Sequence, residues 1–488
     1  MAPDRFHGPG GARPVESRAI SQMDMETMRV QAIRMALLLA ALLLASCASV
    51  HISGPAAPAQ PAHPELATAA ELARTQQTLS GEARAANAAE IERLLAALDD
   101  ETLSRGAAAL PEGDPLYSFA GRALMARGLP LPRPFDLSLL WNTHAGNRPP
   151  ADHDGYRPPL RLAVLLPQSG SLATAASPVR DGLLAGYYGE RRTRPEVVFY
   201  DTQGTASGAV RAYARAVEEG SDYVLGPLGR DEVAAVLADP ARLSVPVLAL
   251  NRAGDETPTG SFSFAMAPED DGIAAANHLL AQNVQRVLVL SGGDDSARRS
   301  VEAFRRQLEA GGGQVSDLLV VIGETPPDMV EALRNAMLKE DGAQAVFLAL
   351  RGAEARAIAP QLVEAGYATR PRVGTSHLFS SGNPENDAAL DGIAFPTERW
   401  ASSGVAGLPM AATVASALPT ARGPAQRLFS FGYDAWLLTA FMERLVTGNG
   451  AELRGATGTL RIDGFGNIER TPAWATFSGG HVVPLSGG

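Results

Sequence analysis

The sequence predicts an α/β protein with two lobes of parallel sheet flanked by helices, preceded by a small α-helical module. Apolar strand segments alternate with helical segments from residue 160 onward, which is typical of parallel sheets wound right-handedly. The strand segments are more numerous than one sheet usually holds, so we expect two lobes. Between residues 65 and 127, apolar residues instead recur at three- and four-residue spacings, which indicates helices.

The first predicted strand is the continuous apolar run LRLAVLLP, which suits a strand buried on both faces. Ser177-Pro178 then supplies the cap and first-turn residues that are preferred where a helix begins. The further predicted strands are EVVFYD, DYVLG, VPVLALN, SFSFAM, RVLVL, VSDLLVVI, AQAVFLAL and PRVGTS. Helices are expected between them, among them 209–219, 231–238 and 269–282.

Both ends of this α/β region, 158–488, differ from its middle. In the tail, Asp463-Gly464 and Gly479-Gly480 separate alternating runs, which predicts hairpins. On the N-terminal side, proline clusters follow a helical module expected over 65–150, in which a tetratricopeptide repeat is only weakly indicated. The Pro- and Ala-rich stretch 47–64 has no apolar period and is expected to be a linker.

Before the linker lies a segment with the organisation of a secretory signal, expected over 28–46. Arg29 and Arg34 form its basic start, an apolar run follows, and small residues precede Cys47. The apolar run is too short to cross a hydrocarbon core. We therefore expect an exported protein.

Cys47 is the only cysteine of the chain, and the order Leu-Ala-Ser-Cys resembles the bacterial lipobox. That resemblance implies lipid attachment at Cys47 after cleavage before it. No Asp follows the cysteine, which by the enteric sorting rule implies the outer membrane. Residues 1–27 contain the acidic Asp24 and Glu26, which signals avoid; we expect them to be untranslated, with Met28 as the start, or disordered.

Composition excludes several classes of function. A formal net charge of −11 argues against nucleic acid as a partner, because phosphate binding needs a clustered basic surface. The local run Arg191, Arg192 and Arg194 is interpreted as a solvated helix end rather than a binding patch. The eight His residues show no pair at metal-ligand spacing, and nucleophile-elbow, zincin and P-loop motifs are missing. We therefore expect no catalytic residues, metal or cofactor.

Ligands of open parallel sheets bind at the carboxyl ends of strands, and polar residues follow several predicted strands. They could converge in a cleft between the lobes, but turn and cap chemistry alone also explains each of them. The candidate cleft residues are Gln168, Ser169, Ser171, Thr202, Asn251, Arg252, Asp294 and Ser376.

Six strings resemble, in chain order, landmarks of the type I periplasmic-binding-protein fold. They are LAVLLPQSGSLATAASPVRDGLLAGYY, YDTQG, VLGPL, VPVLALN, FAMAPEDDGIAAANHLL and GYDAW. Within that superfamily, LLPQSGSLA, RDGLLAGYY, YDT and the PED helix start are most similar to the penicillin-binding-protein-activator lipoproteins of the LppC type. The resemblance covers residues 158–488.

The resemblance implies a non-enzymatic lipoprotein that faces the periplasm from the outer membrane. Such a protein activates an inner-membrane bifunctional penicillin-binding protein and so regulates peptidoglycan synthesis, with peptidoglycan itself as a further partner. The helical module is shorter here than in better-known members, and the loop Gly226-Pro227-Leu228 lacks the hydroxyls that amino-acid-binding relatives use. A lipid-anchored substrate-binding protein of a transporter is the alternative; an exported hydrolase has no recognisable catalytic constellation.

Overall fold

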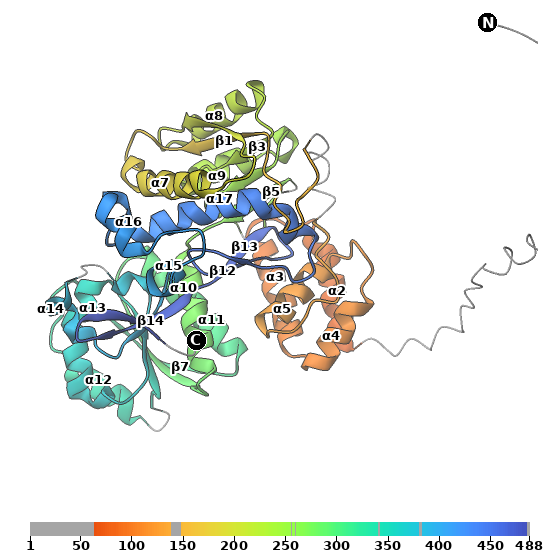
Figure 1. Cartoon of the computed structure of the whole chain (residues 1–488). Helices are drawn as coiled ribbons and strands as arrows, with labels where there is room; N and C mark the ends of the chain where they lie inside the picture. The colour runs from red at the N-terminus through yellow and green to blue at the C-terminus, as the bar shows by residue number, and fades with distance from the viewer. Residues whose placement is uncertain are drawn as a thin grey trace, which may run out of the picture. The chain divides into compact units, whose positions relative to one another are not determined.

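The computed structural model describes residues 63–137, 148–254, 256–258, 260–339, 342–379 and 383–485. Two sheets flanked by helices form two lobes, and a group of helices precedes them (Figure 1). The expected α/β class is therefore confirmed. The signal segment, Cys47 and nearly all of the linker lie outside the described residues. None of the helices in the described part is both long and apolar enough to span a membrane.

The first lobe is built on an eight-stranded sheet in the order β11-β12-β13-β5-β4-β3-β1-β2. Its elements up to the first crossing are β1 (Arg161–Leu166), α7 (Ala173–Gly189), β2 (Glu196–Asp201), α8 (Ala206–Glu218), β3 (Tyr223–Leu225), α9 (Arg230–Leu237), β4 (Val247–Ala249) and β5 (Ser261–Phe264). The chain returns to this lobe with α15 (Arg399–Ser403), α16 (Ala411–Ala417), α17 (Ala425–Thr447), β11 (Leu453–Arg454), β12 (Thr459–Ile462) and β13 (Asn467–Thr471).

The second lobe is built on a seven-stranded sheet in the order β15-β14-β10-β9-β8-β6-β7. Its elements are α10 (Pro268–Leu280), β6 (Arg286–Ser291), α11 (Asp295–Ala310), β7 (Gln314–Val320), α12 (Val330–Leu338), β8 (Ala345–Ala349), α13 (Gly352–Leu362), β9 (Arg372–Gly374), α14 (Pro384–Asp387), β10 (Ala394–Thr397), β14 (Ala473–Ser478) and β15 (His481–Pro484). The two predicted tail hairpins are β12–β13 and β14–β15, one in each sheet.

The chain passes between the lobes three times. The first crossing joins β5 to α10, the second joins β10 to the α15–α17 segment, and the third is the single residue Pro472 between β13 and β14. These crossings lie beside one another in the fold because β13 pairs with β5 and β14 pairs with β10. Any residue close to a crossing is therefore placed where the lobes meet.

Central strands of both sheets, such as β1, β6 and β8, are almost continuously apolar because helices cover both of their faces. In β1, Leu162 and Leu166 belong to the core beneath α7 and α17, whereas Ala163 and Leu165 belong to the core beneath α8 and α9. The same alternation divides β6 of the second lobe between two cores.

Two glycines allow α7 and α17 to pack closely. A Cβ at Gly182 would lie 1.9 Å from the carbonyl oxygen of Phe429, and one at Gly432 would lie 1.9 Å from that of Val179. Both contacts are with backbone atoms, which cannot move aside as a flexible side chain can. Gly432 opens the GYDAW string, so this part of the motif has a packing role.

The start of α7 differs from the prediction. The helix begins at Ala173, and Pro178 lies inside it rather than in its first turn. The N–H groups of Ala175 and Ala176 both bond to the carbonyl of Leu172, which forms an additional irregular turn before Ser177. Pro178 lies in the second turn, where its missing N–H leaves one helical hydrogen bond unmade and its ring crowds the carbonyl of Thr174.

The helical module comprises α2 (Pro64–Gln76), α3 (Gly81–Ala96), α4 (Asp100–Ala109) and α5 (Leu116–Ala126). Its core contains the periodic residues of the sequence, among them Ala69, Ile91, Leu94 and Leu95. This core is continuous with that of the first lobe. The module is therefore packed on the lobe rather than separate from it.

Candidate functional site

The loop after β1, where the sequence suggested an anion site, is bound by the chain's own carboxylate. Asp201 Oδ1 accepts hydrogen bonds from the backbone N–H groups of Gln168 (2.9 Å), Ser169 (3.3 Å) and Gln203 (2.8 Å). Its Oδ2 accepts from the hydroxyl of Ser169 at 2.7 Å. Partial burial opposes ionisation, but these hydrogen bonds keep the pKa of Asp201 below its ordinary value. The donors that would hold an anionic ligand are thus already used.

The neighbouring candidates of the first lobe also make internal contacts. Thr202 is fully buried, and its hydroxyl accepts from the N–H of Gly204 at 3.4 Å. The side-chain amide of Asn251 donates to the carbonyl of Leu228 at 3.0 Å. Ser171 is exposed and makes no hydrogen bond within the described part of the chain.

In the second lobe, Asp294 caps α11 by accepting from the N–H of Ala297 at 2.8 Å. Its other oxygen pairs with Arg351 Nε at 2.8 Å. These bonds lower the pKa of Asp294, the bond from Ala297 contributing most. A cavity of about 10 Å³ lies beside Asp294, Thr375 and His377, which is room for no more than one water molecule.

The structure does not bring these two sets of candidates into contact. Within the described residues, no hydrogen bond or ion pair joins Gln168, Ser169 or Thr202 to Asp294 or Ser376. Ser376 instead belongs to a buried cluster of charges where the lobes meet. We call the residues Asp271, Ser376, Glu398, Arg427 and Arg470 the junction cluster.

The junction cluster is held by contacts within the second lobe and between the two lobes. Asp271 Oδ2 accepts from the backbone N–H of Ser376 at 3.0 Å and from its hydroxyl. Arg427, at the start of α17, donates to the same hydroxyl and lies 3.8 Å from Asp271 Oδ1. Arg470 Nη2 lies 3.9 Å from that oxygen, and Arg427 Nε lies 3.5 Å from Glu398 Oε1.

Each crossing contributes to this cluster. Asp271 lies in the first turn of α10, Glu398 directly follows β10, and Arg470 is in β13 just before the third crossing. The side chains of Asp271 and Arg470 are both 2% exposed. Two guanidinium groups and two carboxylates therefore compensate one another in the interior, where an unpaired charge would be costly.

Several atoms of the cluster have no direct hydrogen-bond partner within the described residues. They are Asp271 Oδ1, Glu398 Oε1, Arg427 Nε, and Nε and Nη2 of Arg470. These groups are nevertheless 3.5–3.9 Å apart, which is within ion-pair distance. The cluster thus has the chemistry of a buried ionic contact between the lobes.

Arg252, the remaining candidate, follows β4 and contacts α10 and β13. Its Nη1 pairs with Asp270 at 3.1 Å and its Nη2 donates to the carbonyl of Ile468 at 3.4 Å. The attraction of Asp270 raises the pKa of Arg252, so this guanidinium stays charged. Burial, together with the nearby charge of Asp463, raises the pKa of Glu469 in the same region.

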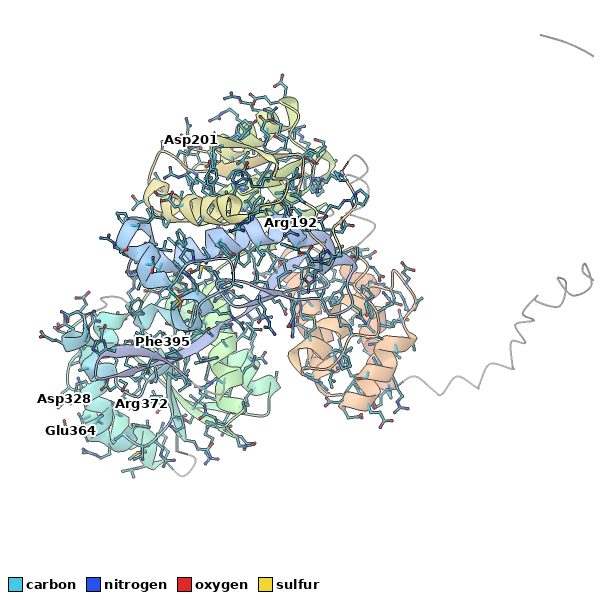
Figure 2. All side chains as sticks on the ribbon, in the orientation of Figure 1. Arg192, Asp201, Asp328, Glu364, Arg372 and Phe395 are labelled. Carbon is cyan, nitrogen blue, oxygen red and sulfur yellow. The ribbon has the colours of Figure 1, made fainter. Side chains whose placement is uncertain are left out.

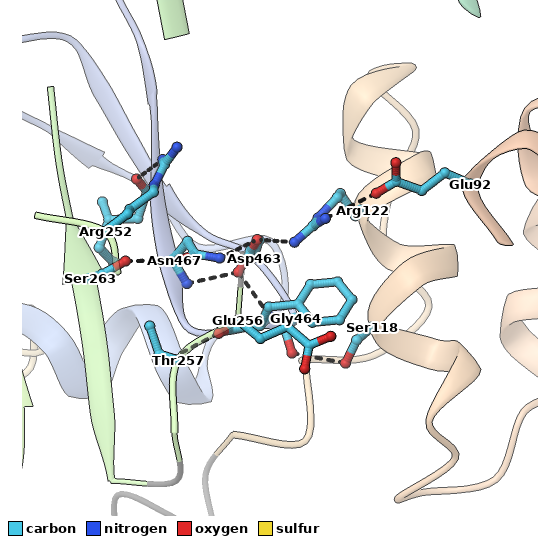
Figure 3. Close-up of polar contacts among 12 residues, drawn as sticks. Glu92, Ser118, Arg122, Arg252, Glu256, Thr257, Ser263, Asp463, Gly464 and Asn467 are labelled. Atoms are coloured by element: carbon cyan, nitrogen blue, oxygen red, sulfur yellow. Dashed lines mark hydrogen bonds and ion pairs between the residues drawn. The ribbon is translucent and has the colours of Figure 1, made fainter. Parts of the chain in front are cut away.

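The tip of the β12–β13 hairpin lies against the helical module (Figure 3). Asp463 pairs with Arg122 of α5, the Ser118 hydroxyl donates to the carbonyl of Gly464 at 2.8 Å, and the rings of Phe119 and Phe465 meet edge to face at 4.7 Å. A second contact follows β4, where Glu256 accepts from Gln76 at 3.2 Å and pairs with Arg84.

Asp434 of the GYDAW string is fully buried in α17. It accepts hydrogen bonds from the N–H of Thr457 at 2.7 Å and from the hydroxyl of Thr457 at 2.6 Å, and also from the N–H of Ala456. Burial outweighs these bonds and raises the pKa of Asp434 to about 6. The carboxylate holds the strand connection before β12 against α17, which is a structural role.

Metal ions in proteins are bound mainly by His, Cys, Asp and Glu side chains. Among the residues that the structure describes, no three His, Cys, Asp or Glu side chains are grouped to hold a metal ion. The polar residues at the strand ends serve as caps, turns and interlobe contacts.

Comparison with known proteins agrees with the architecture. The family described as "LppC putative lipoprotein" matches residues 156–480. The chain belongs to the LppC family. This match spans both lobes, including all five residues of the junction cluster.

Relatives of this LppC chain include curated proteins named penicillin-binding protein activator LpoA. The protein from Mannheimia succiniciproducens is 26% identical over 335 residues, which cover 67% of this chain and 55% of the relative. The protein from Photobacterium profundum is 25% identical over 356 residues, covering 67% of this chain and 57% of the relative. The chain thus aligns with little more than half the length of these relatives.

Solved structures share the fold. The C-domain of LpoA from Haemophilus influenzae, described as a regulator of PBP1A, matches with a TM-score of 0.57 and 23% identity, covering 67% of this chain and 99% of that domain. A putative branched-chain amino acid ABC transporter from Chromobacterium violaceum matches with a TM-score of 0.53 and 27% identity, covering 65% of this chain and all of that protein. The type I periplasmic-binding-protein-like fold is therefore confirmed.

Proposed function

We propose that this LppC-family chain is a non-enzymatic periplasmic lipoprotein, anchored in the outer membrane through Cys47, that activates a bifunctional penicillin-binding protein. In this proposal residues 28–46 are the signal, 47–64 the linker, 65–150 the helical module and 158–488 the two-lobed domain. The activation regulates peptidoglycan synthesis from the outer membrane. The main support is the family match together with relatives named as penicillin-binding protein activators.

The chemistry of the lobe junction supports a protein-binding role over small-molecule capture. A receptor that closes on an amino acid needs free groups at the strand ends to hold its amino and carboxylate groups. Here Asp201 accepts the hydrogen bonds of the donors in the loop after β1. The charge of Asp271 is compensated by Arg427 and Arg470.

The alternative is a lipid-anchored substrate-binding protein of a transporter, supported by the likeness to the Chromobacterium violaceum protein. Thermal unfolding with candidate ligands distinguishes the activator function from the transporter function. A ligand present at 100 times its Kd would add about 2.7 kcal/mol of stability, which gives a clear rise in Tm. We expect no rise with the common amino acids or with soluble muropeptides.

A binding experiment tests the leading proposal. The fragment 63–488 is passed over the immobilised bifunctional penicillin-binding protein of the same bacterium, with an unrelated periplasmic binding protein as control. Saturable binding is expected for the fragment only. No binding, together with stabilisation by an amino acid, would replace the activator function with the transporter function. Release of muropeptides from peptidoglycan by the fragment alone would show an enzyme instead.

A further inference from the structure

An exposed aromatic side chain lies beside two guanidinium groups at the C-terminal end of α7. We call Tyr188, Arg191 and Arg194 the Tyr188 surface. Tyr188 is 70% exposed, unusual for a large aromatic residue. Its ring contacts that of Tyr187 at 5.1 Å, and Tyr187 in turn lies 5.3 Å from Trp436 of α17. The exposed ring therefore sits on a well-packed base.

Arg194 is held in place by the same rings. Its guanidinium carbon lies 4.8 Å from the ring centre of Tyr187 and 5.6 Å from that of Tyr188. Nη1 donates to the carbonyl of Tyr187 at 3.1 Å. The remaining N–H groups of this exposed side chain are available to a partner, and the loss of side-chain freedom on binding is reduced because the group is already positioned.

The three arginines of this segment have different surroundings. Arg192 turns inward, where it pairs with Glu190 and Asp154, both at 2.9 Å, and lies 3.7 Å over the ring of Tyr156. Arg191 and Arg194 are exposed, and no carboxylate of the described residues lies within ion-pair distance of either. Arg191 and Arg194 are thus solvated, whereas Arg192 is half-buried because it pairs with neighbouring carboxylates.

The Tyr188 surface is remote from the strand-end groups described above. It lies beside the start of β2 at Glu196, whereas Asp201 is at the other end of the same strand. Figure 2 shows Arg192 and Asp201 at separate places on the first lobe. The Tyr188 surface is therefore separate from the loop after β1, whose donors bind Asp201.

We propose that the Tyr188 surface docks an acidic segment of a partner protein. Tyr and Arg are the residues that most often dominate protein interfaces, and guanidinium groups bind carboxylates through paired hydrogen bonds. The chain as a whole carries a net charge of −11, but Arg191 and Arg194 form a local pair of exposed cations that can attract the carboxylates of an acidic segment. Under the proposed function, on which this identification of the partner rests, the segment belongs to the penicillin-binding protein.

The test uses two probes and a matched control. Arg191→Glu/Arg194→Glu is compared with Arg211→Glu/Arg230→Glu, which reverses two other exposed arginines of the same lobe. Binding to the immobilised penicillin-binding protein should weaken about tenfold or more in the first variant and change less than about twofold in the second. Poly-glutamate at low salt serves as the second probe, and only the first variant should lose its binding to poly-glutamate.

The outcomes separate the two proposals. Equal binding of both variants to the penicillin-binding protein would overturn the docking surface while leaving the proposed function intact. Loss of poly-glutamate binding in the first variant, with no binding of the unaltered fragment to the penicillin-binding protein, would support the surface and refute the proposed function. If the first variant loses binding to phosphatidylglycerol vesicles but keeps its binding to the penicillin-binding protein and to poly-glutamate, the surface binds lipid and the proposal is wrong.

Discussion

Arg122 of the helical module and Asp463 at the tip of the β12–β13 hairpin form an ion pair with 2.9 Å between Nη2 and Oδ2. Asp463 is 3% exposed, and its other oxygen accepts the backbone N–H groups of Phe465 and Asn467. One carboxylate thus shapes the hairpin and attaches the module to it. The module and the first lobe are expected to behave as one unit.

Replacement of Arg122 by Gln tests this attachment. The change leaves the buried carboxylate of Asp463 without its cation, so we expect a loss of about 2–4 kcal/mol in the free energy of unfolding. Urea unfolding, followed by circular dichroism, measures it. The module should also become sensitive to limited proteolysis before the lobes do.

Arg93→Gln is the matched control, because Arg93 pairs with Glu90 on an exposed face of the same module. This variant should lose less than about 0.5 kcal/mol. Equal losses in the two variants would mean that the hairpin contact does not attach the module.

Replacement of Arg427 by Met tests the junction cluster. Removing one cation leaves Asp271 and Glu398 inadequately compensated, so we expect destabilisation on the order of 3 kcal/mol and a broader range of interlobe arrangements. Spin labels at Ser207 and Asn335, one exposed position in each lobe, report this as a wider distance distribution. The fragment 63–488 has no native cysteine to interfere.

Arg334→Met, which alters an exposed arginine of α12, is the control and should leave the distance distribution unchanged. A narrow distribution in Arg427→Met as well would show that the cluster does not fix the lobes.

Gly432→Ala tests the close approach of α7 and α17. The new Cβ would lie 1.9 Å from a backbone oxygen, so the helices must separate, and overpacking of this kind costs about 1–3 kcal/mol. Gly189→Ala, whose Cβ would meet its nearest atom at 3.7 Å, should be tolerated. Thermal unfolding measures both; equal Tm values would contradict the packing argument.

Cys47→Ser tests the proposed lipid anchor. The protein should fold normally, because the described lobes and module do not include this residue, but it should lose the acyl chains and fractionate with soluble periplasmic proteins. Cells carrying it should show the phenotype of a deletion. Full complementation by an unlipidated protein would contradict the proposed need for a lipid anchor.

Much of the fold could be predicted from local patterns. Continuous apolar runs such as LRLAVLLP mark strands covered on both faces, and glycine pairs such as Gly479-Gly480 mark hairpins. The short strand β10 was missed because AFPT contains a proline and has no apolar run of strand length. The start of α7 was misplaced because Ser177-Pro178 has the residues of a helix start within a helix that had already begun.

The chemistry of the lobe junction could be predicted only in part. Ser376 was found because it follows a strand, but Arg427 and Arg470 were not, since their roles depend on pairing across three chain crossings. The sequence also could not show that Asp201 binds the donors of the β1 loop. Position at a strand end identifies the edge where polar groups gather, but the folded structure decides which groups they bind.

The most direct test of the central claim is a transpeptidation assay. The bifunctional penicillin-binding protein is given lipid-linked precursor with and without the fragment 63–488, and crosslinked product is followed over time. We expect a clear rise in crosslinking with the fragment present and none with the fragment alone. An unchanged crosslinking rate at saturating fragment would contradict the proposed activation.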